Sequence, residues 1–393
     1  MEEQVRINVA TIGHVDHGKT TLTAAMTKYA SKIDSSNAAF RYDQIDKTRE
    51  EKERGITINA TTVEYKIPTK NGYTFLVAHT DCPGHNSYVK NMIVGATQSD
   101  CAILVVDASA GIMPQTTEHV LLAKQTGVKQ MIVVLNKCDV ADKEMVDFVE
   151  FEVRDLLSKH GFEGASIPMI RLSALKVYNG DAAEEKNMQL LFDTMASYIK
   201  KPIRSEDKPF LLPIEDVYSI SGRGTVVTGK VERGICNINN EVEVVGIRET
   251  RKVVVTGLET FKKSLDSIKA GENVGVLLRG FERKDVQRGQ VLAAPGSIKA
   301  YSKFTVQMYV LTKEEGGRSA PFTSKFSPQA FIRTADVTCN FEFPQGREVV
   351  MPGDNLTLNV KILHPLAVEE GTNITFREGG RTIAAGKIVE VLE

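Results

Sequence analysis

The segment Gly13–Thr20 constrains the fold of this chain more than any other feature of the sequence. It reads GHVDHGKT and fits the pattern GxxxxGK[ST], in which the backbone amides of a glycine-rich loop surround phosphate groups. The apolar run Ile7–Ile12 precedes it and a helix-like segment follows, which is the context that the pattern requires. The alternative is a glycine turn without a ligand. We interpret the segment as a phosphate-binding loop at the positive end of a helix.

The first 200 residues alternate short apolar runs with helix-like segments. Between two of these runs, Met145–Leu157 places apolar residues at helical spacing. This alternation predicts an α/β domain of P-loop type, with a mainly parallel sheet and helices on both faces. The expected buried strands are Ile7–Ile12, Phe75–Ala78, Ala102–Val106, Met131–Leu135 and Pro168–Leu172.

The alternation of strand-like and helix-like segments ends at Lys200–Pro209, where prolines and charged residues are concentrated. Beyond it, short alternating runs with turn glycines predict β-barrels, and a weaker break lies at Ala294–Ser297. We therefore predict a first domain at 1–200 that carries the phosphate-binding loop, a linker at 201–208, and β-barrels at 209–296 and 297–393. The clearest barrel strands are expected within Thr225–Gly234, Glu241–Gly246, Phe304–Val310 and Leu356–Ile362.

Composition narrows the class of protein. The five cysteines are scattered, which indicates reduced thiols and a cytoplasmic protein. No apolar run approaches the roughly 20 residues of a membrane span, and the first residues do not resemble a secretory signal. The formal net charge of -1 means that any nucleic-acid-binding surface must be local.

Two further motifs follow later strands of the predicted sheet. Asp81–Gly84 reads DCPG and would place a carboxylate beside the phosphates, where it can hold a magnesium-bound water. Asn136–Asp139 reads NKCD, and the carboxylate of Asp139 can accept from the N1–H and 2-amino groups of guanine, a donor pair that adenine lacks. Each motif alone is compatible with a polar turn. In this order on successive strands they predict GTP and GDP as ligands.

Catalysis and metal binding are assigned to few side chains. Lys19 would neutralise charge on the β- and γ-phosphates, and the hydroxyl of Thr20 would ligate Mg²⁺ together with Asp81. Thr57 could reach Mg²⁺ only when the γ-phosphate is present, which would couple hydrolysis to loop release. The alternative for Thr57 is an ordinary strand threonine. The predicted GTP-binding residues are Gly13, His14, Val15, Asp16, His17, Gly18, Lys19, Thr20, Thr21, Asp81, Gly84, Asn136, Lys137, Asp139, Ser173, Ala174 and Leu175.

Over its whole length the sequence resembles the elongation factor Tu family of bacterial and organellar translational GTPases. Matching blocks include GHVDHGKTTLTAA, RYDQIDKTREEKERGITIN, DCPGH, DKPFLLPIEDVYSISGRGTVVTGKVERG, GENVGVLLRG and REGGRT. The resemblance implies a GTPase that carries aminoacyl-tRNA to the ribosomal A site and releases it after ribosome-stimulated hydrolysis. It further implies a monomer, an exchange factor of the elongation factor Ts type, no membrane partner, and a location in the cytoplasm or an organelle matrix.

The same resemblance assigns a catalytic role to His85, which would position the attacking water. Val15 and Ile56 would form an apolar gate that keeps His85 away until the ribosome acts. From the residues alone, His85 is only a polar loop residue. The residues implied to contact tRNA are Lys90, Asn91 and Arg288 near the 5′ end, Glu259 at the 3′ terminal adenine, Lys262 near the aminoacyl ester, and Gln329, Arg333 and Arg377 at the T stem. Taken singly, each of these would be interpreted as a solvated surface residue.

The sequence departs from the family pattern at two positions near the expected amino-acid pocket. Thr62 replaces a usual histidine, and Lys262 replaces a common arginine. Arginine and lysine are not equivalent at a bidentate site, so we expect a changed range of accepted aminoacyl-tRNAs.

Three alternative functions are open. The chain could be another translational GTPase, such as a selenocysteine-specific or initiation factor, or the GTPase subunit of a sulfate adenylyltransferase. It could also be a paralogue that keeps the fold and acts as a binding protein. The intact nucleotide motifs favour a working GTPase.

Overall fold

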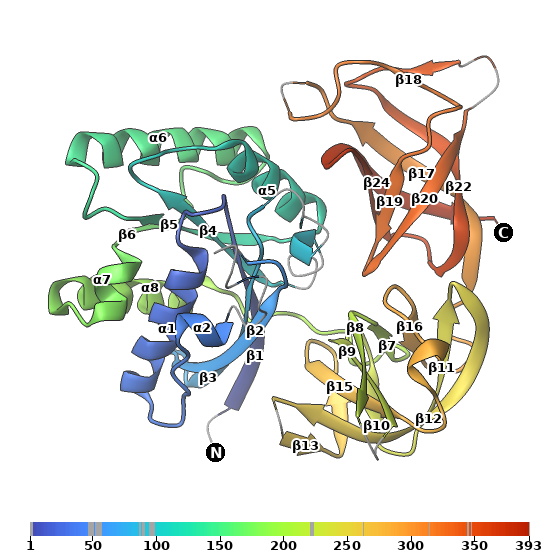
Figure 1. Cartoon of the computed structure of the whole chain (residues 1–393), viewed down its shortest axis with the longest axis horizontal. Helices are drawn as coiled ribbons and strands as arrows, with labels where there is room; N and C mark the ends of the chain where they lie inside the picture. Colours follow the sequence, from blue (N-terminus) through green and yellow to red (C-terminus); the bar gives the residue numbers. More distant parts are fainter. Residues whose placement is uncertain are drawn as a thin grey trace. The chain divides into compact units, whose positions relative to one another are not determined.

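The computed structural model of the chain describes residues 3–45, 51, 57–85, 88, 91–93, 99–220, 224–261, 263–313, 315–343, 346 and 348–392 (Figure 1). The chain divides into two compact units, Met1–Pro202 and Ile203–Glu393. The finer division at the boundaries given above stays a prediction. In the described part of the chain, no helix combines the length and the apolar character needed to cross a membrane.

The first unit is built on one sheet with the strand order β2-β3-β1-β4-β5-β6. All of its neighbouring strands pair in parallel except β2, which lies antiparallel to β3 at the edge. The five strands expected from apolar runs are confirmed. Apolar runs miss β2, because Glu64 and Lys66 interrupt the apolar residues of this edge strand. The bounds are β1 (Glu3–Ile12), β2 (Thr61–Pro68), β3 (Tyr73–Asp81), β4 (Cys101–Asp107), β5 (Gln130–Asn136) and β6 (Met169–Arg171).

Helices cover both faces of this sheet, as the alternation of elements predicts. Figure 1 shows α1, α7 and α8 on one side and α5 and α6 on the other. The expected helix at Met145–Leu157 lies within α6, whose first turn is capped by Asp142 accepting from the Met145 amide at 2.8 Å. The bounds are α1 (Lys19–Ile33), α2 (Tyr42–Ile45), α5 (Pro114–Gln125), α6 (Lys143–Lys159), α7 (Ala174–Asn179) and α8 (Ala182–Tyr198).

The second unit begins with a sheet in the order β7-β16-β11-β12-β15-β9-β8, with β13 paired to β12 and a separate pair of β10 and β14. Alternate side chains of these strands fill one core, for example Val227, Val244 and Val276. The strands expected near Thr225–Gly234 and Glu241–Gly246 are confirmed as β9 and β11. The bounds are β7 (Leu211–Pro213), β8 (Asp216–Ile220), β9 (Gly224–Lys230), β10 (Ile235–Asn237), β11 (Glu241–Gly246), β12 (Arg248–Thr260), β13 (Lys263–Leu265), β14 (Ser267–Lys269), β15 (Asn273–Leu278), the 3-10 helix η2 (Arg283–Asp285) and β16 (Val291–Ala293).

The rest of this unit is a closed barrel in the order β17-β22-β20-β19-β23-β24, as predicted, with β18 paired to β21. Its core contains the stacked and edge-on rings of Phe322, Phe341 and Phe376. A smaller apolar cluster places Val245 of β11 with Ala367 of β22 and so joins the barrel to the preceding sheet. The bounds are β17 (Ala300–Val310), β18 (Phe322–Thr323), β19 (Gln329–Ile332), β20 (Ala335–Glu342), β21 (Val349–Val350), β22 (Asn355–Ala367), β23 (Asn373–Glu378) and β24 (Arg381–Val391).

Candidate nucleotide-binding site

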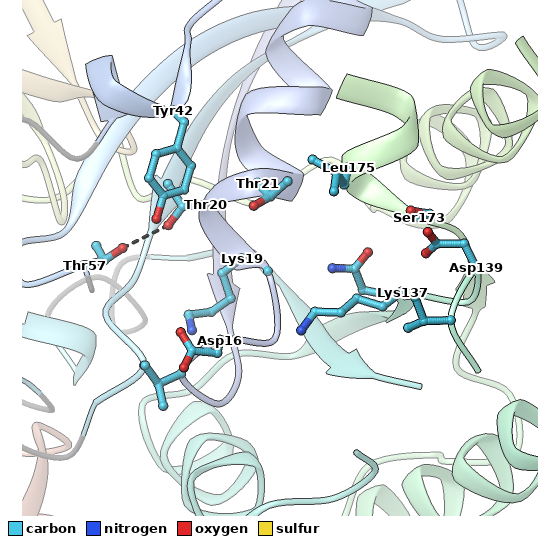
Figure 2. A pocket seen from close by; sticks show the side chains of 15 residues that line it. Asp16, Lys19, Thr20, Thr21, Tyr42, Thr57, Lys137, Asp139, Ser173 and Leu175 are labelled. Carbon is cyan, nitrogen blue, oxygen red and sulfur yellow. Dashed lines mark hydrogen bonds between the residues drawn. The ribbon is translucent and has the colours of Figure 1, made fainter. Parts of the chain in front are cut away.

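A cavity of about 300 Å³ opens in the first unit where the loops after β1, β3, β5 and β6 converge. Figure 2 shows Tyr42 and Thr57 at one end and Asp139 and Ser173 at the other, with Lys19 between them. Ligand pockets of this kind lie at the carboxyl ends of parallel strands. The lining residues are Val15, Asp16, Gly18, Lys19, Thr20, Thr21, Tyr42, Thr57, Gly84, Asn136, Lys137, Asp139, Val140, Ser173 and Leu175.

The loop between β1 and α1 is shaped by glycine. Gly13 has φ 137°, and a Cβ there would stand 2.3 Å from the carbonyl oxygen of Val105. Gly18 has φ 87° and is the N-cap of α1, so the free amides of the first helical turn face the cavity. The buried Lys19 donates from Nζ to the His14 carbonyl at 2.6 Å. The loop therefore presents amides and one ammonium group, which suits an anionic ligand.

The two histidines of this loop add no charge at neutral pH. Burial lowers the pKa of His17 to about 4, with a further contribution from His14 and an opposing one from Asp107. Burial also lowers the pKa of His14, and the ammonium of Lys19 acts in the same direction. Lys19 and Lys137 are therefore the cationic side chains that line the cavity.

Three oxygen-bearing side chains meet at the Thr57 end. The hydroxyl of Thr20 donates to Asp81 Oδ2 at 2.6 Å and lies 2.9 Å from the hydroxyl of Thr57. All three residues are buried. Asp81 is placed here because β3 pairs in parallel with β1, with Asp81 opposite Thr11. A buried cluster of hydroxyl and carboxylate oxygens is the donor set that Mg²⁺ prefers, so these residues fit the ion expected here.

Gly84 brings the loop after β3 against the phosphate-binding loop. A Cβ at this position would stand 2.3 Å from Lys19 Nζ and 2.8 Å from the Val15 amide nitrogen, so only glycine fits. His85 follows directly, and its ring lies 6.0 Å from that of Tyr88 between centroids. The catalytic role of His85 stays a prediction.

At the opposite end, Asn136 acts as a brace between loops. Its Nδ2 donates to the His17 carbonyl at 2.9 Å, and its Oδ1 accepts from the Ala174 amide at 2.9 Å. Asn136 thereby joins the phosphate-binding loop to the loop after β6. Asp139 and the exposed Leu175 both line this end of the cavity, where a nucleotide base could bind.

The structure separates the predicted nucleotide residues into two groups. Most line the cavity, whereas Gly13, His14, His17, Asp81 and Ala174 are not among its lining residues. Several of them bond a lining residue; the His17 carbonyl, for example, accepts from Asn136 Nδ2 at 2.9 Å.

Two lining residues, Tyr42 and Val140, were outside the sequence-based assignment. Val140 directly follows the NKCD motif, so its position was a usable signal. Tyr42 comes from the short helix α2 and belongs to the matching block RYDQIDKTREEKERGITIN, but that block assigned it no role and spacing gives no indication of one.

The predicted tRNA-binding residues are placed less uniformly. Ile56 of the gate, Lys90 and Lys262 lie outside the described residues. Asn91 donates to the Ile58 carbonyl at 2.8 Å, and Arg288 donates from Nε to the Thr334 carbonyl at 3.2 Å. Glu259 and Gln329 are exposed on β12 and β19. A contact of these residues with tRNA stays a prediction.

The side chains of Arg333 and Arg377 are largely shielded from solvent. The side chain of Arg333 is 10% exposed and is bound to two glutamates. Arg377 is 5% exposed and donates to the Thr382 hydroxyl at 2.7 Å. Neither is the solvated surface charge considered as the alternative, and both guanidinium groups already have internal partners.

The first unit thus has the loop, the oxygen cluster and the base-recognition loop of a P-loop GTP-binding domain, all facing one cavity. Family models match the chain in sequence order: the elongation factor Tu GTP binding domain at residues 4–201, elongation factor Tu domain 2 at 224–293, and the elongation factor Tu C-terminal domain at 297–392. The chain belongs to the elongation factor Tu family, and it is a GTPase of translation elongation that binds GTP and GDP.

Proposed function

We propose that this GTPase carries aminoacyl-tRNA to the ribosomal A site in its GTP form and releases it after hydrolysis. The observation that carries the proposal is the contact of Thr57 with Thr20, which itself bonds Asp81. This contact ties the segment before β2 to the place where the terminal phosphate would lie. Such a segment can report which nucleotide is bound, and a tRNA carrier needs that signal to bind and let go.

The chemistry of the step follows from the residues of the cavity. Lys19 and the amides at the start of α1 would stabilise charge on the β- and γ-phosphates. Thr20, Asp81 and Thr57 would hold Mg²⁺, which supplies further neutralisation of phosphate charge when it is bound. His85 would hold the attacking water by a hydrogen bond, and Val15 would keep that ring away before the ribosome acts.

After the γ-phosphate leaves, Thr57 would lose the interaction that holds it at the cavity, and its segment would move. Recognition of many tRNAs would rest on phosphate charge and A-form shape, with little reading of bases. We also propose that the protein is a monomer and works in the cytoplasm or an organelle matrix. An exchange factor of the elongation factor Ts type would release its GDP so that GTP can bind.

A deacylation-protection assay tests carriage of tRNA. The GTP-loaded protein is mixed with charged and uncharged tRNA, and the rate of ester hydrolysis is followed. We expect protection with GTP and little with GDP. Thr57→Val, which keeps the shape and removes the hydroxyl, should bind GDP normally and lose GTP-dependent protection, whereas Thr57→Ser should retain it. Equal protection by the GTP and GDP forms of the wild type would refute the proposed switch.

A single-turnover assay tests His85. His85→Ala should bind GTP and programmed ribosomes but cleave GTP roughly 10²–10³-fold more slowly on them, the usual loss for one positioned polar group. Val15→Ala should raise the rate without ribosomes. A near-normal ribosomal rate in His85→Ala would remove His85 from the mechanism.

A further inference from the structure

Asp107 ends β4 at the same edge of the sheet as the nucleotide motifs, although it belongs to none of them. It pairs across the sheet with Asn136, the first residue of the NKCD motif. Asp107 is 5% exposed, so its carboxylate is held in a fixed environment. Its Oδ1 accepts from the Ser109 amide at 2.8 Å and from the Ser109 hydroxyl at 2.6 Å.

The other oxygen of this carboxylate holds a side chain of the cavity wall. Asp107 Oδ2 lies 2.7 Å from Lys137 Nζ, and the side chain of Asp107 is 8% exposed against 39% for Lys137. Figure 2 shows Lys137 extending from the Asp139 end of the cavity toward Lys19. A lysine has many rotamers, and a buried, ionised partner selects one of them.

The carboxylate is suited to this task because it remains ionised. Burial alone would raise its pKa, but the hydrogen bonds from Lys137 and Ser109 outweigh burial and lower the pKa of Asp107 below its usual value. The backbone of Asp107 also contacts the phosphate-binding loop, since its amide donates to His17 Nδ1 at 3.2 Å. Asp107 therefore contacts both the phosphate-binding loop and the base-recognition loop.

We propose that Asp107 is a positioning residue for the nucleotide: its carboxylate holds the Lys137 ammonium so that the lysine stem forms a fixed wall of the guanosine slot, opposite Leu175. The inference rests on the proposed nucleotide cavity and deepens it. Because Lys137 lies toward the base end, Asp107 acts on the nucleoside that GDP and GTP share. The alternative is that Asp107 only stabilises the turn after β4, through its bonds to Ser109.

The test measures Kd and dissociation rate constants for fluorescent GDP and GTP, together with Tm of nucleotide-free protein. Asp107→Asn should weaken both nucleotides by on the order of tenfold, mainly through faster dissociation. Lys137→Met should weaken them at least as much. In the Lys137→Met background, adding Asp107→Asn should change Kd less than about twofold, because the group that Asp107 holds is gone.

Ser109→Ala is the matched control, since it removes one bond to the carboxylate and leaves the contact with Lys137. It should lower Tm and keep Kd close to the wild-type value. Equal losses from Asp107→Asn in both backgrounds, or an unchanged Kd in Asp107→Asn, would overturn the inference. So would a wild-type Kd in Lys137→Met, which keeps the test decisive even if Asp107→Asn does not fold. Failure of the wild type to bind GDP would refute the cavity itself.

Discussion

Removal of the Arg333 side chain should destabilise the second unit strongly. Arg333 donates from Nε and Nη2 to the two carboxylate oxygens of Glu232, at 2.8 and 3.2 Å. It also donates to Glu369 at 3.1 Å and to the Ala367 carbonyl at 2.7 Å. Arg233 lies 2.6 Å from the same oxygen of Glu369. Arg333→Ala leaves two carboxylates without their shared cation.

The expected loss follows from the burial of the three groups. Breaking a buried ion pair by removing one partner costs about 3–5 kcal/mol. Arg333 is 10% exposed, but the side chains of Glu232 and Glu369 are 39% and 36% exposed, so water compensates them in part. We therefore expect a loss of about 3 kcal/mol, at the lower end of that range. For a unit of this size, the corresponding fall in Tm is roughly 6–12 °C.

Calorimetry of the full chain would measure the fall in Tm, and hydrogen exchange of the β19 and β20 amides would assign it to the second unit. Lys252→Ala is the matched control: Lys252 forms a single exposed pair with Glu241 at 2.9 Å, which should contribute about 0–1 kcal/mol. Arg333→Lys should recover only part of the stability, because an ammonium cannot reproduce the bidentate contact. A loss in Arg333→Ala no larger than that in Lys252→Ala would refute the reasoning.

The network also predicts a pH dependence. Burial alone would raise the pKa of Glu232, but the Arg333 guanidinium outweighs burial and lowers it below the usual value of 4.5. A group with a lowered pKa in the folded state contributes stability above its unfolded pKa and loses it as the pH falls through the folded pKa. The difference between wild type and Arg333→Ala should therefore be constant near neutral pH and shrink below roughly pH 4.

Three further changes address nucleotide and tRNA binding. Asp139→Asn should weaken GTP by about 1.5–3 kcal/mol and gain xanthosine triphosphate, which has a carbonyl where guanine has its amino group; unchanged GTP affinity in a filter-binding assay would contradict the base assignment. Gly13→Ala should reduce both folding yield and GDP binding, because the new methyl group would stand 2.3 Å from the Val105 carbonyl oxygen; a wild-type Tm and GDP affinity would show that the loop relaxes. Arg288→Ala should weaken charged tRNA evenly across amino acids and reduce the salt dependence of binding by about one phosphate contact, and an uneven loss would argue for a contact with the aminoacyl end.

The sequence alone was sufficient to predict the local structural features of this protein. A strand followed by a glycine-rich loop and a helix is a short-range pattern, so Gly13–Thr20 predicted both the backbone of the loop and the ligand it suits. The β-type alternation of the second half predicted the strands in the same way, because only alternate residues face a core. Because the DCPG and NKCD motifs each follow a strand of the predicted parallel sheet, the sequence was sufficient to place Asp81 and Asp139 at one edge of that sheet.

Only the tertiary structure decided which side chains from distant segments meet. Asp107 matches no motif, and it reaches Lys137 because β4 and β5 are neighbours in the sheet. Tyr42 lines the cavity because α2 returns to it. Arg333 carries the positive charge that is typical of an RNA-binding residue. The closed barrel and the adjoining sheet nevertheless bring Glu232 and Glu369 against it. Spacing along the chain specifies the face on which a residue lies, whereas its partners depend on which strands pair and which barrels close.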